Sequence, residues 1–376
     1  MKIIIFAGPT GGHFFPALAF VECFQKRHPK ARILLVTGVR GRSLVEKAKN
    51  QIETEYEFLP DFPFPRSSRL DFLIRGVPFL LKLAQAFLKT EKILTNFKPE
   101  LAVGFGSYLA FPGILASVRR KIPSLIHEQN RILGRANRWL TRCAGRIALS
   151  FEPPAPLVFP RLAPTGLPLR SALVRSAAQK KRAEPPIFPS GRVRILLLGG
   201  SQGSHSLNRL WAAMLQLLSD EEKSKIAVIH ITGEKDFGWV ETMYLAKGIQ
   251  ALAFSFQERM EEVYPEADLA VTRAGASTLF ELALFGLPAV VFPYPYAEGH
   301  QEENAHYFEK EGAVVRLSER SSTPVRLKEQ VFELVSSVAL RNRMSKNLER
   351  LARPGASERL VDLAEELLLP REACLR

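Results

Sequence analysis

The sequence predicts an α/β protein built from two doubly wound domains, each with a parallel β-sheet covered by helices on both faces. Two observations predict this class. Short apolar runs alternate with helix-like amphipathic segments, and strands of parallel sheets, which are buried on both faces, read as such continuous apolar runs. The scheme also starts twice, with "KIIIFAG" at residues 2–8 and with "VRILLLGG" at residues 193–200. We therefore expect two sheets of similar design.

The elements follow in order along each half. The first half gives a helix from about Pro16 to Arg27 and another near residues 41–50. Further strands of the first half are expected at residues 31–38, 100–106 and 122–130. Those of the second half are expected at residues 226–233, 267–275 and 287–294. A charged, proline-rich insert at residues 179–192 is suited to a surface loop near the joint of the halves. We place the domains at residues 1–166 and 167–349, with a C-terminal helix at about 350–376 that docks back on the first.

Composition excludes several classes. At 376 residues and 46% hydrophobic, the chain can fill two cores. Cys23, Cys143 and Cys374 are odd in number and far apart, so neither a disulfide framework nor a structural zinc site is indicated. The N-terminus lacks the pattern of a signal peptide. The uncharged run at residues 101–118 is interrupted by glycines and a proline, which favours a strand, a turn and a buried helix over a membrane span.

The positive charge is concentrated in the first half. The chain has a formal charge of +14, whereas residues 1–170 alone hold 26 Lys and Arg against 11 Asp and Glu, a net of +15. This asymmetry indicates an anionic partner of the first half, such as a membrane surface or a phosphorylated substrate, although an ordinary basic surface would give the same counts. No recognition pattern for nucleic acid is present, so no nucleic-acid partner is expected.

Four glycine-rich turns follow predicted strands, at residues 8–12, 104–107, 199–203 and 273–278. Such turns expose backbone N–H groups at the positive end of a helix dipole, which suits phosphate or oxyanion binding. The first turn lacks the G-x-G-x-x-G spacing, so a nicotinamide enzyme is disfavoured. We expect these turns to gather around one cleft.

The third turn also permits another reaction class. Gly199, Ser201 and Gly203 match G-x-S-x-G, the pattern of a hydrolase nucleophile elbow, and Asp268 and His300 are candidates for the other triad members. A phosphate-binding turn needs only backbone N–H groups and one hydroxyl. A serine hydrolase therefore stays as the alternative.

Residues 271–305 are the richest in polar groups. A strand ends at Arg273, small residues follow, and a helix begins near Ser277. Thr278 and Glu281 have capping-box spacing, so Glu281 either caps this helix or accepts hydrogen bonds from a ribose. A second helix start brings further side chains that could hold sugar hydroxyls: His300, Gln301 and Asn304. Together these residues indicate a nucleotide-sugar donor site.

A helix within residues 71–89 has one basic stripe and one apolar face. The stripe is Arg75, Lys82 and Lys89, and the opposite face holds Leu73, Val77, Leu80, Ala84, Phe87 and Leu88. Because Pro78 breaks helices, we expect the helix to start near Val77. The apolar face either packs on the core or lies on an anionic bilayer surface.

The motifs taken in order resemble the MurG family, the glycosyltransferases of peptidoglycan synthesis that convert lipid I to lipid II. They are "AGPTGGHFFPALA", "HEQN", "GGSQGS", "TRAGAST" and "HQEENA". The resemblance implies the GT-B fold, two Rossmann-like domains facing across a cleft. It implies inverting transfer of N-acetylglucosamine from UDP to the muramyl 4-hydroxyl of undecaprenyl-pyrophosphoryl-MurNAc-pentapeptide, at the cytoplasmic face of the bacterial inner membrane. No cofactor is expected, and because the sequence contains no Asp-x-Asp pair, no tightly bound metal is expected either. A related GT-B glycolipid synthase or a UDP-N-acetylglucosamine epimerase is the nearer alternative.

The resemblance also assigns residues. The donor would be bound by Ser201, Gln202, Gln257, Arg273, Gly275, Ala276, Ser277, Thr278, Glu281, His300, Gln301 and Asn304. The acceptor side would include Thr10, Gly11, Gly12 and Tyr108, while Asn130 and Arg170 would approach the transferred sugar from the first domain and the linker. Arg273, the turns and the helix N-termini would neutralise the departing UDP. A displacement of this type needs a general base of near-neutral pKa, for which His13 is favoured and Glu128 is held in reserve.

Overall fold

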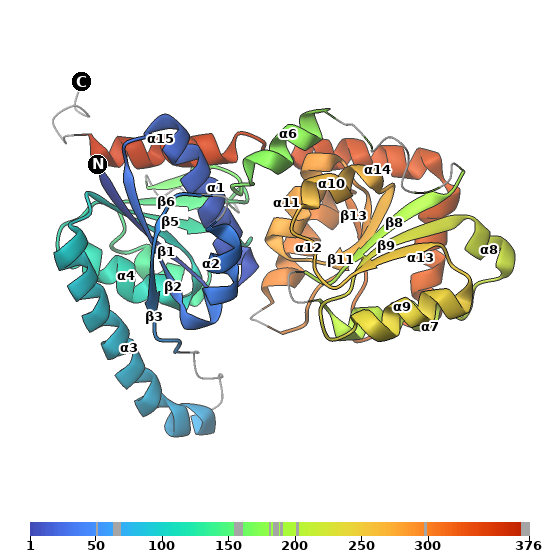
Figure 1. Ribbon diagram of the computed structural model, residues 1–376, viewed down its shortest axis with the longest axis horizontal. Coiled ribbons are helices and arrows are strands. Elements are labelled where there is room, and N and C mark those ends of the chain that lie inside the picture. The colour runs from blue at the N-terminus through green and yellow to red at the C-terminus, as the bar shows by residue number, and fades with distance from the viewer. Residues whose placement is uncertain are drawn as a thin grey trace. The chain divides into compact units, whose positions relative to one another are not determined.

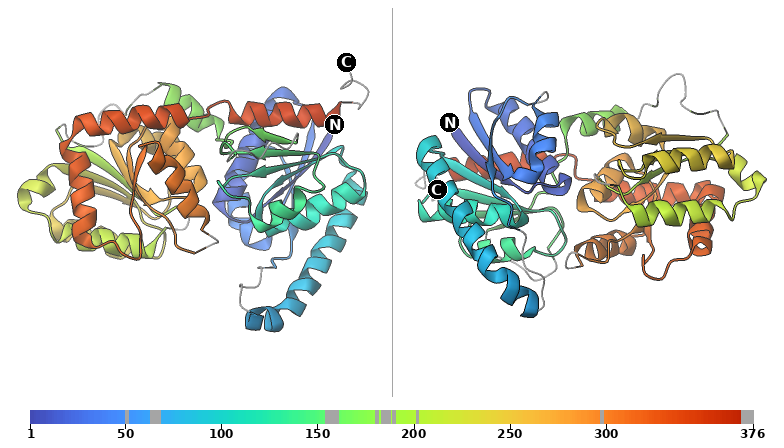
Figure 2. Two further views of the ribbon diagram at one scale, coloured as in Figure 1. Left: turned by 180° about the vertical axis from the view of Figure 1, so that it is seen from behind. Right: turned by 60° about the horizontal axis from the view of Figure 1, so that its bottom comes forward.

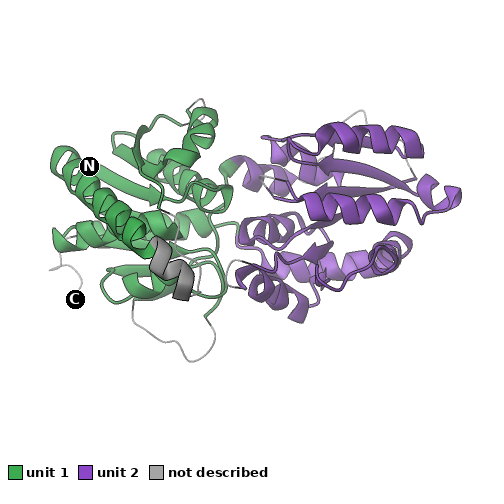
Figure 3. Ribbon diagram, turned by 90° about the horizontal axis from the view of Figure 1, so that it is seen from below, with its two compact units in different colours: residues 1–171, 354–376 green, residues 172–353 purple. Residues whose placement is uncertain are grey.

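The computed structural model divides into two compact units, residues Met1–Ser171 with Pro354–Arg376, and residues Ala172–Arg353 (Figure 3). Each unit is described by itself. The structure describes residues 1–49, 52–62, 69–153, 161–179, 182, 188, 191–200, 203–296 and 299–369, and only the backbone of 69–75.

Unit 1 is built on a parallel sheet of seven strands in the order β3-β2-β1-β4-β5-β6-β7 (Figure 1). The strands are β1 (Lys2–Ala7), β2 (Arg32–Gly38), β3 (Glu55–Leu59), β4 (Leu101–Phe105), β5 (Ser124–Glu128), β6 (Arg146–Leu149) and β7 (Leu162–Pro164). The helices are α1 (Gly11–Arg27), η1 (Val39–Gly41), α2 (Arg42–Ala48), α3 (Arg69–Phe97), α4 (Ser107–Arg119), α5 (Arg135–Leu140) and the C-terminal α15 (Ala356–Leu368). Helix α6 (Ser171–Gln179) begins at the last residue of the 1–171 segment and continues into unit 2.

Alternation along β1 fills two cores, one on each face of this sheet. Ile3 and Ile5 point to the core that α1 and α15 cover, whereas Ile4 and Phe6 point to the core that α3, α4 and α5 cover. The uncharged run at residues 101–118 is strand, turn and helix, as its glycines indicated. Within the described part of the chain, no helix is long and apolar enough to cross a membrane.

Unit 2 repeats the design with six parallel strands in the order β10-β9-β8-β11-β12-β13 (Figure 1). The strands are β8 (Val193–Leu198), β9 (Ile226–Ile231), β10 (Ala251–Phe254), β11 (Leu269–Arg273), β12 (Ala289–Phe292) and β13 (Val314–Arg316). The helices are α7 (His205–Leu215), α8 (Asp220–Ser224), α9 (Phe237–Lys247), α10 (Met260–Val263), η2 (Tyr264–Glu266), α11 (Ala276–Phe285), α12 (His300–Lys310), α13 (Pro324–Ser336) and α14 (Val338–Leu351).

Two helix starts differ from expectation, and both involve a proline. The first helix begins at Gly11, five residues before Pro16, and α3 runs through Pro78. In the first helix, Pro16 comes early, so that most of the helix lies beyond it and keeps its hydrogen bonds. In α3, Pro78 is exposed. Proline has no N–H to donate to the carbonyl one turn earlier, and water can hydrate that carbonyl instead. The prediction that the second helix starts near Val77 was therefore wrong.

Candidate functional site

The carboxyl edge of the unit 1 sheet brings two glycine turns together. Gly8 follows β1 and is so enclosed that a Cβ there would lie 2.6 Å from Ser107 Cβ and 2.8 Å from His13 Cδ2. The first turn ends at the start of α1, whose N-cap Thr10 makes no side-chain cap. Thr10 and Gly12 are exposed and Gly11 is buried. The start of α1 thus carries no acidic side chain and no side-chain cap, and its helix dipole favours a bound anion.

His13 lies half-buried in the first turn of α1, against the second glycine turn. Gly106 and Ser107 both have left-handed backbones, with φ of 59° and 65°. A Cβ on Gly106 would lie 2.8 Å from Oε1 of Gln129 and 3.1 Å from Nδ1 of His13. Gln129, which the motif analysis did not assign, thus shares the space beside this imidazole. The sequence feature that could have identified Gln129 is its position directly after β5, within "HEQN".

The reserve base candidate, Glu128, is 2% exposed and holds the loop that follows it. One carboxylate oxygen accepts from the Asn130 backbone (3.0 Å) and side-chain amide (3.2 Å), and the other accepts from Gly134 N (3.0 Å) and Asn137 Nδ2 (2.9 Å). Both oxygens are therefore engaged in fixing the loop that carries Asn130.

His127, which precedes that glutamate in β5, is neutral. Full burial lowers its pKa to about 4, against a weaker opposing effect of its contact with the Gly166 carbonyl. Its Nε2 lies 3.2 Å from Ser150 Oγ and 3.4 Å from Gly166 O. A neutral imidazole behind the turns adds no charge to the site.

Tyr108 belongs to a polar cluster that sequence reasoning did not find. Its hydroxyl donates to Asp61 Oδ1 (3.1 Å) and accepts from Arg40 Nη2 (3.0 Å). Burial, together with the charge of Asp61, raises the pKa of Tyr108 to about 12. The phenol is therefore a neutral donor and acceptor at the second turn. Arg170, further along the chain, is half-buried with its guanidinium 5.3 Å from the centre of the Phe15 ring.

In unit 2, the turn after β8 requires glycine. Gly203 has φ +73°, and a Cβ there would lie 2.3 Å from Thr232 O and 2.7 Å from Gly233 Cα. The turn thus rests directly on the backbone that follows β9. Ser201 and Gln202, predicted to bind the donor diphosphate, lie outside the described residues.

Arg273, at the end of β11, uses all five of its N–H donors within unit 2. Its Nη1 and Nη2 form a two-pronged pair with Glu319, each at 2.7 Å, and the other contacts are to Ser204 Oγ (3.0 Å), Ser206 Oγ (2.7 Å) and Phe292 O (3.3 Å). It is only 6% exposed. In this arrangement the guanidinium ties the turn after β8, the start of α7, the end of β12 and the loop after β13 to β11, and its charge is balanced by Glu319.

The helix α11 starts at Ala276 after Gly275, which makes no side-chain cap. Thr278 therefore lies inside the helix, and the capping-box interpretation of Thr278 and Glu281 is wrong. Glu281 instead accepts a hydrogen bond from the Tyr264 hydroxyl at 2.6 Å. Ser277 Oγ is buried with no hydrogen-bond partner among the described residues, an unusual state for a hydroxyl.

The start of α12 lies against the same turn. Asn304 is fully buried and its amide donates to Ala274 O at 3.5 Å, while Gln301 Oε1 accepts from Tyr294 N at 2.9 Å. His300 Nδ1 is buried and has no partner within the described part of the chain. In a separate loop after β10, half-buried Gln257 accepts from Arg259 N at 3.2 Å.

The hydrolase alternative fails on topology. Asp268 accepts from Arg194 N at 2.9 Å and from Arg182 at 2.6 Å, at the amino end of β8 and β11, whereas the turn at 199–203 follows the carboxyl end of β8. Strands rise about 3.3 Å per residue, so a strand of this length separates the acid from that turn by roughly 15 Å. Asp268 cannot complete a triad there.

Two family models match the chain: the N-terminal domain of glycosyltransferase family 28 over residues 3–149 and its C-terminal domain over residues 194–366. Together they span most of the sequence. The chain belongs to glycosyltransferase family 28. The fold of both units and the glycine turns at their sheet edges are those expected from the resemblance.

Curated relatives match over nearly the full length. A protein of Desulfotalea psychrophila is 34% identical over 98% of this chain and 97% of its own, and one of Coxiella burnetii is 36% identical over 96% and 97%. Both are named UDP-N-acetylglucosamine--N-acetylmuramyl-(pentapeptide) pyrophosphoryl-undecaprenol N-acetylglucosamine transferase.

Among solved structures, MurG of Acinetobacter baumannii has a TM-score of 0.72 and 27% identity and covers 97% of this chain and 99% of its own. A UDP-N-acetylglucosamine 2-epimerase has a TM-score of 0.65 at 13% identity, which shows a shared fold only. The comparison thus favours the transferase over the epimerase alternative.

Unit 1 also has exposed apolar side chains on α3, α4 and α5, the helices that cover one face of its sheet. These side chains, called the exposed apolar surface below, are Val77 (65% exposed), Leu80, Leu81, Leu88 (68%), Leu115 and Trp139 (64%). Figures 1 and 2 show that α3 extends beyond the sheet. The apolar face of α3 is thus split: Leu80 and Leu88 face solvent, whereas Phe87 packs on the core.

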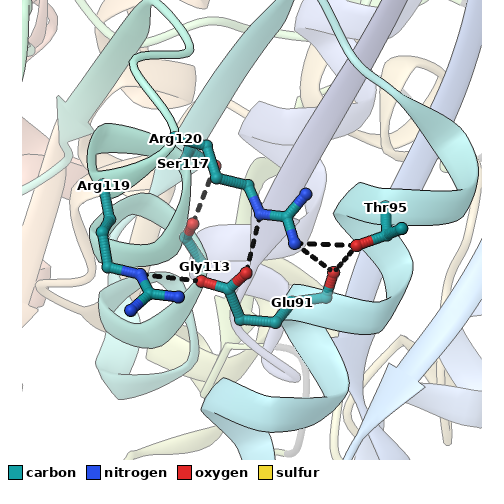
Figure 4. A network of polar contacts seen from close by, with 6 residues as sticks. All are labelled: Glu91, Thr95, Gly113, Ser117, Arg119 and Arg120. Carbon is teal, nitrogen blue, oxygen red and sulfur yellow. Dashed lines mark hydrogen bonds and ion pairs between the residues drawn. The ribbon is translucent and has the colours of Figure 1, made fainter.

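Cationic side chains occur on α3 and just after α5. Lys82 is exposed, Lys89 Nζ donates to Phe58 O at 2.7 Å, and the Arg142 guanidinium lies 4.6 Å from the centre of the Trp139 ring. Arg75, predicted in the same stripe, lies in the segment described by its backbone only. Glu91 ties α3 to α4 by accepting from Arg120 Nε (2.7 Å) and Arg119 Nε (3.3 Å), as Figure 4 shows.

Proposed function

We propose that this chain transfers N-acetylglucosamine from UDP-N-acetylglucosamine to the muramyl 4-hydroxyl of undecaprenyl-pyrophosphoryl-MurNAc-pentapeptide, converting lipid I to lipid II in peptidoglycan synthesis. The full-length similarity to relatives with this named activity supports the substrates. The single structural observation that carries the proposal is the packing of a histidine, His13, against two glycine turns at the carboxyl edge of the unit 1 sheet. Parallel α/β sheets bind ligands at this edge.

Unit 2 binds the donor through the turns that follow β8 and β11. Backbone N–H groups of the 199–203 turn and of the α11 start hold the diphosphate, with Ser201, Gln202, Gly275, Ala276 and Thr278 along it. Arg273 acts by holding the turns in place, since its donors are already used.

The sugar and nucleoside parts of the donor occupy the groups beside that turn. Glu281 accepts from the ribose hydroxyls and Gln257 borders the uracil. Buried Ser277 Oγ and His300 Nδ1 gain partners from the donor, because buried polar atoms are normally hydrogen-bonded. Gln301 and Asn304 fix the loop that meets the transferred sugar.

Unit 1 binds the acceptor. The start of α1 at Thr10, Gly11 and Gly12 cradles the acceptor diphosphate with backbone N–H groups. Tyr108 contacts the muramyl sugar, and Asn130 and Arg170 approach the transferred N-acetylglucosamine. No acidic residue occurs in the first turn of α1, so nothing there repels the anion.

The reaction is a single displacement with inversion. The muramyl 4-oxygen attacks the anomeric carbon, the bond from that carbon to the UDP oxygen breaks, and UDP leaves with the electron pair. His13 takes the hydroxyl proton, because an imidazole has the near-neutral pKa that a general base needs. Glu128 is the weaker candidate, since its two oxygens already accept four hydrogen bonds.

The exposed apolar surface of α3, α4 and α5 seats unit 1 on an anionic bilayer, at the cytoplasmic face of the inner membrane. Exposed apolar side chains together with cationic ones are the pattern of helices that lie in the membrane interface. An undecaprenyl acceptor requires such contact, because its lipid tail stays in the bilayer.

Transfer of labelled N-acetylglucosamine to a short-chain lipid I analogue tests the activity, with wild type compared to His13→Ala and Glu281→Ala. We expect both variants to lose at least about 100-fold in transfer, with donor affinity reduced only for Glu281→Ala. A folded wild type without transfer, or His13→Ala at the wild-type rate, would contradict the proposal.

Sedimentation with vesicles tests the membrane contact separately. The double variant Leu81→Glu, Leu88→Glu should lose most binding to vesicles with anionic headgroups while its transfer to the water-soluble analogue stays unchanged. Leu245→Glu, on a leucine of unit 2 that is 79% exposed, is the control. Equal binding of all three proteins would contradict the assignment of this surface.

A further inference from the structure

Gln129 has a fixed amide orientation. It follows β5 directly and is 3% exposed. Its Nε2 donates to the carbonyl of Phe105, the last residue of β4, at 3.1 Å. Because a carbonyl can only accept, the amide nitrogen must be the atom that faces Phe105, and Oε1 points the other way.

That oxygen ends beside Gly106 and has no hydrogen-bond partner among the described residues. A Cβ on Gly106 would lie 2.8 Å from Gln129 Oε1 and 3.1 Å from His13 Nδ1, so both atoms border the space that the glycine leaves open. Buried carbonyl oxygens are nearly always hydrogen-bonded, and one without a partner needs an explanation. The nearest titratable ring on β5, His127, is neutral and makes its own contacts to Ser150 and Gly166.

We propose that Gln129 is a positioning residue for His13: in the acceptor complex its Oε1 accepts a hydrogen bond from Nδ1–H of the imidazole. This rests on the proposed role of His13 as base. The two ring nitrogens of a histidine have separate roles, and a hydrogen bond at one fixes the tautomer that leaves the other as acceptor. With Nδ1 protonated and held, Nε2 takes the proton of the muramyl hydroxyl as the oxygen bonds to the anomeric carbon and UDP departs.

A matched pair of variants isolates the oxygen. Gln129→Met and Gln129→Glu have similar volume and both lose the N–H that binds Phe105, but only the glutamate keeps an acceptor. At saturating UDP-N-acetylglucosamine and about pH 8, we expect Gln129→Met to lower kcat roughly 10- to 100-fold, which is part of the roughly 100- to 10,000-fold that a general base contributes, with an unchanged KM for the acceptor analogue. Gln129→Glu should keep kcat within about threefold of wild type. Equal losses in both variants, or none in either, would overturn the proposal, and so would an effect confined to KM.

The same variants in a His13→Ala background complete the test. If Gln129 acts through His13, then Gln129→Met adds no further loss to the residual rate of His13→Ala. If the fold losses in kcat of the two single variants multiply in the double variant, Gln129 acts independently of His13 and the proposal is overturned. Failure of the proposed function itself is recognised without any Gln129 variant, since it means that wild type does not transfer or that His13→Ala does so normally.

Discussion

The hydroxyl of Tyr264, in η2, donates a hydrogen bond of 2.6 Å to Oε2 of Glu281 in α11. The Tyr264 ring is itself held by stacking on Phe285, with the ring centres 5.0 Å apart and the planes 23° apart. Tyr264 is 1% exposed. A rigid, buried phenol therefore fixes the direction of the carboxylate that we assign to the ribose, before any donor binds.

Tyr264→Phe should weaken donor binding without unfolding the chain. The phenylalanine keeps the ring stacking and removes one hydrogen bond, worth about 1 kcal/mol, so we expect the Kd for UDP-N-acetylglucosamine to rise about 3- to 10-fold. Glu281→Gln should raise it further, by about 10- to 100-fold, because it replaces the acceptor carboxylate itself. Calorimetric titration measures both. A larger effect of Tyr264→Phe than of Glu281→Gln would contradict this order.

The fold could be predicted well because parallel strands bury both faces and leave continuous apolar runs. Burial of β1 and β8 is nearly complete, and the strand that ends at Arg273 was predicted at that residue. Pro78 shows the limit, since propensity alone ends a helix there, but an exposed proline leaves its carbonyl to water. Hydration of this carbonyl requires that Pro78 be exposed, and the residues around Pro78 in the sequence do not reveal its exposure.

The site could be predicted only as far as the turns. Glycines mark where strands meet helix starts, and these turns lie at the sheet edges. Partners from distant segments were not predictable: Glu319 for Arg273, Tyr264 for Glu281 and Phe105 for Gln129. Each of these pairs joins residues that are far apart in the sequence, and it forms only because the loops of the folded chain bring them together. A local sequence motif cannot predict such a pair.

Ser277→Ala should separate stability from binding. Its Oγ is buried with no partner among the described residues, so removal of the hydroxyl relieves an unfavourable burial and should leave the free energy of unfolding unchanged or raise it by up to about 1 kcal/mol. If the donor supplies the missing partner, the Kd for UDP-N-acetylglucosamine should rise about 5-fold. Denaturant unfolding and calorimetric titration give the two numbers. A loss of stability with unchanged donor affinity would mean that the hydroxyl is structural.

Two buried histidines should make the chain sensitive to mild acid. Burial lowers the pKa of His127 to about 4 and that of His230 to about 3, while both are near 6.5 when unfolded. Below pH 6.5 the unfolded chain binds protons that the folded chain does not, so stability present above pH 6.5 is lost as pH falls. Each histidine should cost about 1 kcal/mol between pH 6.5 and 5.5.

Denaturant unfolding across this window tests the effect, and His230→Asn should reduce the slope by about half while it lowers stability at neutral pH. Ordinary carboxylates titrate mostly below about pH 4.5, so they contribute little there. A free energy of unfolding that does not change between pH 6.5 and 5.5 would show that the two imidazole rings are hydrated in the folded chain.

Glu91 should matter for the attachment of α3 more than an ordinary surface acid. Its side chain is 14% exposed and accepts from Arg119 and Arg120, while Arg120 Nη2 also donates to the Glu91 carbonyl (3.2 Å) and to Thr95 Oγ1 (2.7 Å), as drawn in Figure 4. Glu91→Gln removes the charge that holds two guanidinium groups at the end of α4. Since the network is partly buried, we expect a loss of about 1–2 kcal/mol, above the value of an isolated surface pair.

The exposed ion pair of Glu46 with Lys49 gives the control, since Glu46→Gln should change stability by less than about 0.5 kcal/mol. Hydrogen exchange adds the location: amides of α3 near Glu91 should exchange faster in Glu91→Gln, because the substitution weakens the ionic attachment of α3 to α4, whereas amides of β1 should not change. Uniform acceleration across unit 1 would mean that the network stabilises the whole sheet. Unchanged exchange in α3 would mean that apolar packing of Ala86, Ile93 and Leu94 holds the helix without the ion pairs.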